Sequence, residues 1–153
     1  MHISISGEAA MKQLGQRLGS LLRGGEVIEL VGDVGAGKTT LTKGIASGMK
    51  IDEDVQSPSF TISRVYDAPE AIRLAHYDFY RLHDAGIMAD ELHETLHEGK
   101  TVTIIEWAEI ITGVLPEDRL TITITGDAND EHARTVELKA GGEVSERLIK
   151  ELA

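Results

Sequence analysis

The sequence has 153 residues, 41% of them hydrophobic, so it is long enough to bury the core of one domain without disulfides. It carries 26 acidic and 15 basic residues and a formal net charge of −11, which argues against a protein that binds nucleic acid by itself, because phosphate contacts need a basic surface. It contains no cysteine, which excludes disulfides and thiolate metal sites.

The same features predict one cytoplasmic domain spanning residues 1–153. No apolar run approaches the roughly 18 residues needed to cross a bilayer, so no membrane partner is expected. The first six residues lack the charged and apolar segments of an export signal.

The first third of the chain alternates between helical and strand patterns. Apolar residues at helical spacing predict a helix over Ser6–Leu22, capped by its first residue and ended by Gly24. A run rich in β-branched residues predicts a strand over Glu26–Val31. The glycine-rich turn Gly32–Gly37 then leads into a second helix, Lys38–Met49.

The remaining two thirds continue this alternation. After a loop over Val55–Thr61, the patterns predict two strands, Ile62–Tyr66 and Ile72–Asp78, joined by a turn over Asp67–Glu70. A helix over Asp84–Glu98 and a strand over Thr101–Glu106 follow. The last expected elements are two strands, Arg119–Thr125 and Arg134–Leu138, joined by a polar loop over Gly126–His132, and a helix over Glu143–Leu152. Alternating strands and helices predict an α/β layer fold, and the consecutive strand pairs indicate that part of the sheet is antiparallel.

The turn between the first strand and the second helix matches a phosphate-binding loop. Gly32–Thr39 reads GDVGAGKT and fits the pattern G-x-x-x-x-G-K-[ST]. Glycines let successive N–H groups turn inward around an anion, and the helix N-terminus adds its unpaired N–H groups. Lys38 is expected to reach the β- and γ-phosphates, and the Thr39 hydroxyl is expected to coordinate Mg²⁺. A plain glycine turn is the alternative.

A second motif favours a different chemistry. His93-Glu94-Thr95-Leu96-His97 fits the zinc-protease pattern H-E-x-x-H, which leaves a zinc hydrolase built on His93, Glu94 and His97 as a remote alternative. Catalytic zinc needs a third protein ligand, but the position six residues after His97 is Thr103, inside a predicted strand. Two surface histidines one turn apart are therefore the favoured interpretation.

Carboxylates close two of the predicted strands. Glu106 follows one apolar run and Asp78 another, the positions where open α/β sheets place ligand groups. Either residue could help to hold Mg²⁺ near a phosphate loop. The hydroxyl-rich segment Ser57–Thr61 could contact a γ-phosphate, and Arg81 could stabilise charge in the transition state. Trp107, the only tryptophan, is expected to pack in the core.

Four segments together resemble one known family. They are GDVGAGKTT (Gly32–Thr40), SPSFTI (Ser57–Ile62), HYDFYRL (His76–Leu82) and IIEWAE (Ile104–Glu109). Their order and spacing are similar to those of the bacterial TsaE family, the small ATPase that supports threonylcarbamoyladenosine (t6A) modification of tRNA. Each segment alone is short or generic, but the four together cover nearly the whole chain.

The resemblance implies a P-loop NTPase fold with a mixed sheet flanked by helices, and ATP with Mg²⁺ as ligands. It implies action with the threonylcarbamoyl-transferring enzyme and the inactive paralogue of that enzyme, with tRNA reached only through these partners. It also implies weak ATP hydrolysis by the isolated chain. The alternative is a binding module in which ATP is mainly a structural ligand for complex assembly.

The resemblance also assigns roles residue by residue. It implies that Lys38 binds phosphate, that Thr39 and Glu106 are Mg²⁺ ligands, and that Asp78 is required for hydrolysis. The full set of nucleotide-binding residues expected is Gly32, Asp33, Val34, Gly35, Ala36, Gly37, Lys38, Thr39, Thr40 and Ser59. Two positions depart from the family pattern, because Ser59 and Met11 stand where threonine is usual.

Overall fold

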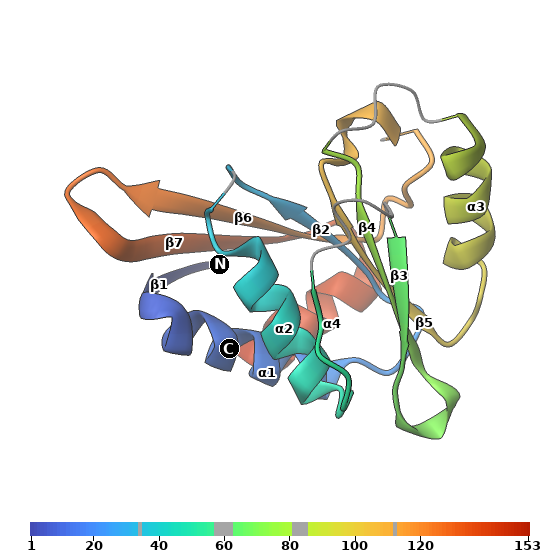
Figure 1. The fold of residues 1–153 in the computed structure, drawn as a ribbon, viewed down its shortest axis with the longest axis horizontal. Coiled ribbons are helices and arrows are strands. Elements are labelled where there is room, and N and C mark those ends of the chain that lie inside the picture. Colours follow the sequence, from blue (N-terminus) through green and yellow to red (C-terminus); the bar gives the residue numbers. More distant parts are fainter. Residues whose placement is uncertain (34, 57–62, 81–85, 112) are drawn as a thin grey trace.

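The computed structural model describes residues 1–33, 35–56, 63–80, 86–111 and 113–153. They form one seven-stranded sheet with helices on both faces (Figure 1). The elements are β1 (His2–Ser6), α1 (Gly7–Leu21), β2 (Val27–Val31), α2 (Lys38–Gly48), β3 (Ser63–Asp67), β4 (Arg73–Asp78), α3 (Gly86–Leu96), β5 (Thr101–Glu106), β6 (Leu120–Asp127), β7 (Asp130–Ala140) and α4 (Glu143–Leu152). Within these ranges, no helix has the length and apolar character needed to cross a bilayer.

The sheet is parallel in its centre and antiparallel at both edges. Its strand order is β1-β7-β6-β2-β5-β4-β3. Strand β2 pairs in parallel with β5 and β6, and β4 pairs in parallel with β5. The outer pairs β1–β7, β6–β7 and β3–β4 are antiparallel. The mixed sheet expected from consecutive strand pairs is therefore confirmed.

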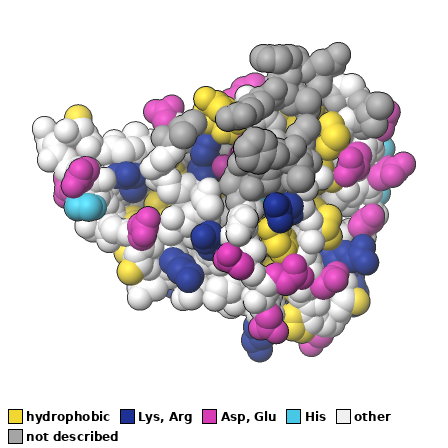
Figure 2. Space-filling view, viewed as in Figure 1, with side chains coloured by type: hydrophobic (Ala, Val, Ile, Leu, Met, Phe, Trp, Pro, Cys, Tyr) yellow, Lys and Arg dark blue, Asp and Glu magenta, His cyan; other side chains and the backbone are white. Residues whose placement is uncertain are grey.

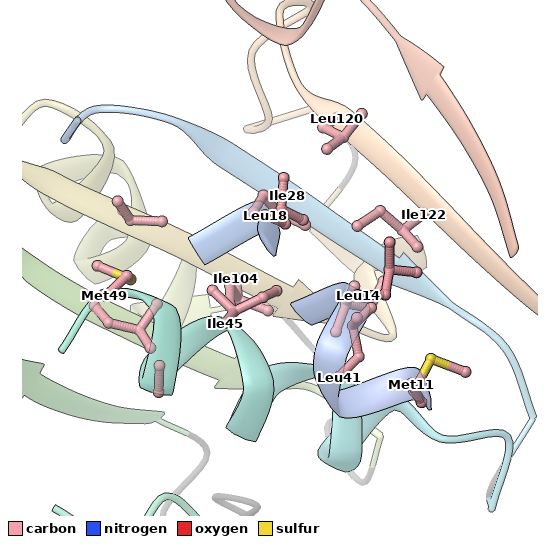
Figure 3. Close-up of a cluster of buried hydrophobic side chains, with 14 of the residues drawn as sticks. Met11, Leu14, Leu18, Ile28, Leu41, Ile45, Met49, Ile104, Leu120 and Ile122 are labelled. Atoms are coloured by element: carbon pink, nitrogen blue, oxygen red, sulfur yellow. The ribbon is translucent and has the colours of Figure 1, made fainter. Parts of the chain in front are cut away.

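Each face of the sheet has its own hydrophobic core. Helices α1, α2 and α4 cover one face, and α3 lies on the other (Figure 1). Figure 3 shows Leu18 of α1 beside Ile28 of β2 and Ile45 of α2 beside Ile104 of β5, and both strand residues are fully buried. Since both faces are covered, β5 is buried along its whole length, as its β-branched sequence TVTIIE predicts.

Helices α1 and α2 approach each other with glycines at the contact. A Cβ on Gly19 of α1 would lie 2.1 Å from the Ile45 carbonyl oxygen, and one on Gly44 of α2 would lie 2.3 Å from the Lys12 carbonyl oxygen. Gly15 and Gly48 face the opposite backbone in the same way. The two backbones therefore touch where no larger side chain fits.

The C-terminal helix is attached by two carboxylates. The buried Glu26 accepts hydrogen bonds from the N–H groups of Arg23 and Gly24, both at 2.8 Å, and from the guanidinium of Arg147 on α4 at 2.9 Å. Asp118 accepts the N–H groups of Val144 and Ser145 in the first turn of α4. Burial pushes the pKa of Asp118 upward, but the hydrogen bonds from Ser145 and Val144 outweigh it and lower that pKa below its usual value.

The sequence-based prediction was wrong in two places. The N-terminal strand β1 was not expected, and it forms the sheet edge against β7. The polar loop expected over Gly126–His132 is mostly hairpin, because β6 continues to Asp127 and β7 starts at Asp130. The outer ends of β6 and β7 are exposed and rich in polar residues, so their composition alone resembles that of a loop. Ser6 takes the N-cap position of α1 as expected, but its side chain makes no capping hydrogen bond.

Candidate functional site

The glycine-rich turn joins the end of β2 to the start of α2. Gly35 and Gly37 have φ values of +82° and +116°, a backbone conformation that residues other than glycine rarely adopt. Gly37 is the N-cap of α2 and has no side chain that could form a capping hydrogen bond. The first N–H groups of an α-helix have no partner within it, so this uncapped end presents donors and a positive dipole to an anion.

Lys38 lies at the start of α2, buried beneath the turn. Its Nζ donates to the carbonyl oxygen of Gly32 at 2.7 Å and is 3.9 Å from Oε1 of Glu106. It also lies 4.0 Å from the ring centroid of Trp107, within the range of a cation–π contact. The ammonium is therefore held between the turn and the end of β5.

Glu106 ends β5 as a nearly fully buried carboxylate, only 3% exposed. Its two oxygens face different partners. Oε1 faces the Lys38 ammonium, and Oε2 is 2.6 Å from Nε2 of His76 on β4. A buried charge of this kind needs compensating partners, and Lys38 and His76 supply them.

Asp78 is the register partner of Glu106 on the neighbouring strand. It is half-buried, and its Oδ1 accepts the N–H of Tyr80 at 2.9 Å. The N–H of Phe79 donates to the backbone oxygen of Glu106 at 3.1 Å, which ties the two strand ends together. The sheet therefore brings both expected carboxylates to the same edge, beside the start of α2.

Trp107 follows Glu106 with a φ of +58°, an uncommon conformation for a bulky residue. Its ring is half-buried and lies 4.8 Å from the ring of the exposed Tyr80, centroid to centroid. The expectation of a core position is correct only in part, because the ring packs beside the core under α3 and also contacts Lys38. Such strained residues often occur at functional sites.

A cavity of about 360 Å³ opens beside the turn. It lies between Gly35–Thr40, the start of α1 with Met11, and β7 with Arg134. Arg134 donates through Nε to the carbonyl oxygen of Ala36 at 3.1 Å, so the β6–β7 hairpin is bonded to the turn. Nothing in the sequence indicated this contact, since 98 residues separate its partners.

The structure brings most of the expected site residues together. Gly32, Asp33, Gly35, Ala36, Gly37, Lys38, Thr39 and Thr40 form the turn and the first turn of α2, next to Glu106. Val34, Ser59 and Arg81 lie outside the described residues. His76 was part of a quoted motif, but no role was assigned to it. The available signal was a polar residue inside an apolar strand run, two positions before Asp78.

The alternative zinc motif lies on an exposed face of α3. His93, Glu94 and His97 are exposed, and the two imidazole rings are 4.4 Å apart. The Nδ1 atom of His97 lies 2.7 Å from the backbone oxygen of His93. In the part of the chain that the structure describes, no group of three or more His, Cys, Asp or Glu residues could hold a metal ion.

The turn and the side chains around it carry groups that suit a nucleotide and its metal ion. An uncapped helix end, a buried ammonium and a neighbouring cavity provide donors and positive charge for phosphates. The Thr39 hydroxyl and the Glu106 carboxylate are oxygen donors of the kind that Mg²⁺ prefers. The residues present therefore fit a magnesium nucleotide.

A glycine turn and lysine between a parallel strand and a helix, on a mixed sheet flanked by helices, define a P-loop NTPase-like fold. The chain matches the family model of the threonylcarbamoyl adenosine biosynthesis protein TsaE over residues 5–136. The chain therefore belongs to the TsaE family, as its sequence segments indicated.

Relatives and a solved structure agree with this assignment. The TsaE protein of Streptomyces coelicolor is 40% identical over 128 residues, covering 79% of this chain and 84% of the relative. That of Bacillus subtilis is 39% identical over 142 residues, covering 93% and 87%. The crystal structure of Bacillus subtilis YdiB superposes with a TM-score of 0.80 at 32% identity, covering 99% of this chain and 93% of YdiB.

Proposed function

We propose that this chain is a Mg²⁺-dependent ATPase that supports t6A modification of tRNA together with a threonylcarbamoyl-transferase complex. The observation that carries the proposal is the buried ammonium of Lys38, held between a glycine turn and the carboxylate of Glu106 at 3.9 Å. A lysine at this point of a strand–turn–helix unit is suited to bind the β- and γ-phosphates of a nucleoside triphosphate. Family membership supports the t6A role.

In ATP hydrolysis, different residues of the chain have different roles. The N–H groups at the start of α2 and the Lys38 ammonium bind the phosphates and offset charge that develops on the γ-phosphate. Asp78 orients the attacking water and accepts a proton from it. The water oxygen bonds to the γ-phosphorus while the bond to the ADP oxygen breaks, and the proton then passes to the released phosphate. Thr39 and Glu106 would hold Mg²⁺, which would neutralise charge on the phosphate oxygens.

The partners follow from the charge of the chain and from its family. With a net charge of −11, this chain is poorly suited to bind tRNA directly. Figure 2 shows acidic side chains interspersed with basic ones on the visible face, without a continuous basic surface. We therefore assign the tRNA-binding surface to the transferring enzyme and its inactive paralogue, with this chain acting through them in the cytoplasm.

The substitution Lys38→Ala tests the proposal. We expect it to lower ATP hydrolysis by roughly 100-fold or more, because the phosphates lose their cation. Lys43→Ala is the matched control, since Lys43 is exposed on the same helix. Hydrolysis is measured with and without the partner proteins, and ATP binding is measured by calorimetry with Mg²⁺ present.

Three outcomes separate the possible functions. Loss of turnover in Lys38→Ala, with Lys43→Ala unchanged, supports the ATPase. Tight ATP binding without turnover, even with the partners, favours the binding module instead. Absence of any heat of binding from ATP or a close analogue to the wild-type chain overturns both.

A further inference from the structure

His76 is a polar side chain in the buried middle of strand β4, where apolar residues are usual. It is fully buried in β4 between Ala75 and Tyr77, and its register partner on β5 is the buried Ile104. Its Nδ1 has no hydrogen-bond partner among the described residues. Burying an unpaired ring nitrogen is unfavourable for folding, so stability alone does not explain why a histidine stands here.

The other ring nitrogen makes a short contact with the site. Nε2 of His76 lies 2.6 Å from Oε2 of Glu106, and both side chains are almost inaccessible to solvent. A carboxylate oxygen only accepts hydrogen bonds, so Nε2 is the donor in this pair. The two side chains belong to paired strands, His76 to β4 and Glu106 to β5. The register of these strands fixes the distance between the two side chains.

This contact fixes the orientation of the carboxylate group, so that one oxygen faces His76 and the other faces the glycine turn. With Oε2 bound to His76, the remaining oxygen, Oε1, is the one that faces Lys38 at 3.9 Å. Without the imidazole, the Glu106 side chain could turn about its terminal bonds and lose this orientation. The buried histidine therefore selects one orientation of the carboxylate.

We propose that His76 is a positioning residue that holds Glu106 with Oε1 directed at the phosphate loop, ready to bind Mg²⁺. The inference rests on the proposed function, in which Glu106 is a metal ligand. Carboxylates that bind metals are commonly oriented by hydrogen bonds from residues behind them, and loss of such a partner lowers metal affinity or activity by about 10–100-fold.

Three variants test the role of His76. His76→Leu fills the space but removes the donor, whereas His76→Gln places an amide N–H near the former Nε2. His76→Asn is polar but too short to reach Glu106. We measure Mn²⁺ binding in the presence of ADP by electron paramagnetic resonance, and the Mg²⁺ concentration that gives half-maximal hydrolysis. Thermal melting confirms that each variant is folded.

We expect His76→Leu and His76→Asn to weaken Mn²⁺ binding by about tenfold or more, and His76→Gln to restore it to within about threefold of wild type. ADP binding without metal should be unchanged in all three. Folded variants that bind Mn²⁺ as the wild type does would overturn the proposal. If His76→Leu does not fold, the comparison of the Gln and Asn variants tests the positioning role. If His76 were only a structural polar residue, the two variants should bind Mn²⁺ equally well.

Glu106→Gln separates this inference from the proposed function. If Glu106→Gln leaves Mn²⁺ binding unchanged, Glu106 is not a ligand and the assignment of the metal site fails. If Glu106→Gln weakens binding and His76→Leu does not, only the positioning role fails. In the double variant, His76→Leu should add nothing to the loss caused by Glu106→Gln, since its effect acts through that carboxylate.

Discussion

Two carboxylates stand at the ends of neighbouring strands, and their surroundings differ. Glu106 is buried between an ammonium and an imidazole, so its orientation is fixed on both sides. Asp78 is half-buried, and one of its oxygens accepts a backbone N–H. A buried, oriented carboxylate is suited to hold a metal ion, whereas a partly exposed one can reach a water molecule. This contrast favours Asp78 as the residue that orients water.

The substitution Asp78→Asn tests this division. Asparagine retains an oxygen that can accept the Tyr80 N–H, so the backbone at Tyr80 should keep its conformation. We expect hydrolysis to fall by roughly 100-fold, because the amide is a poorer acceptor for the water proton, while nucleotide affinity changes less than about threefold. Turnover and calorimetric binding are measured side by side, with the exposed Asp67→Asn as the control. Unchanged turnover in Asp78→Asn would transfer the role to Glu106.

Both carboxylates were predictable because each closes an apolar strand run in the sequence. The contacts of His76 and Arg134 were not, since they depend on which strands become neighbours. His76 meets Glu106 across 30 residues, and Arg134 meets Ala36 across 98. Local patterns carry no information about such pairs.

Helices α1 and α2 pack through glycines, and this contact connects the glycine-rich turn Gly32–Gly37 to the N-terminal part of the chain. Lys38 is the first residue of α2, and Met11 of α1 lines the cavity beside the loop. Because the two backbones are in direct contact, neither helix can shift without displacing the other. The shape of the cavity thus depends on the glycine contact.

The substitution Gly19→Ala tests the contact. The added Cβ would lie 2.1 Å from the Ile45 oxygen, so the helices must separate. We expect a loss of about 1–3 kcal/mol in the free energy of unfolding, measured by urea denaturation, despite the better helix propensity of alanine. Gly99→Ala is the control, because a Cβ there meets nothing within 4 Å and the backbone is outside the left-handed region. Equal stability of both variants would refute close packing at Gly19.

Most elements followed from local pattern, and the failures have a common cause. The strand Thr101–Glu106 and the helix Glu143–Leu152 were predicted with their observed bounds. Strand β1 and the outer part of the hairpin were missed because only half-buried and exposed residues build them, so they lack a strong apolar signal. Their strand conformation comes from pairing with neighbours, which a single sequence does not reveal.

At the scale of the whole molecule, α4 completes the core formed by α1 and α2. Leu148 and Leu152 are buried in that core. Polar contacts to Glu26 and Asp118 fix the helix at both its middle and its start. The last helix is therefore attached to segments from the beginning and from the late part of the chain.

The Asp118 contact predicts a pH dependence of stability. Because the folded pKa of Asp118 is below its usual value of 3.8, its contribution is fully present above that value and is lost as the pH falls through the lowered pKa. We expect Asp118→Asn to cost about 1 kcal/mol at pH 7, because the amide nitrogen of asparagine cannot accept one of the two backbone N–H groups that the carboxylate accepts. In denaturant unfolding the difference from wild type should shrink below pH 3.8, whereas the exposed neighbour variant Glu117→Gln should differ little throughout. A difference that stays constant with pH would contradict the assigned charge.

The strand order has a consequence for the newly made chain. Strand β2 leads into the phosphate loop, but its two flanking strands are β5, which begins at Thr101, and β6, which ends at Asp127. A nascent chain made only as far as residue 100 therefore contains this turn but neither of the strands that flank β2. The turn can therefore take its supported conformation only after residues 101–127 have been made, so this part of the fold is completed late in synthesis.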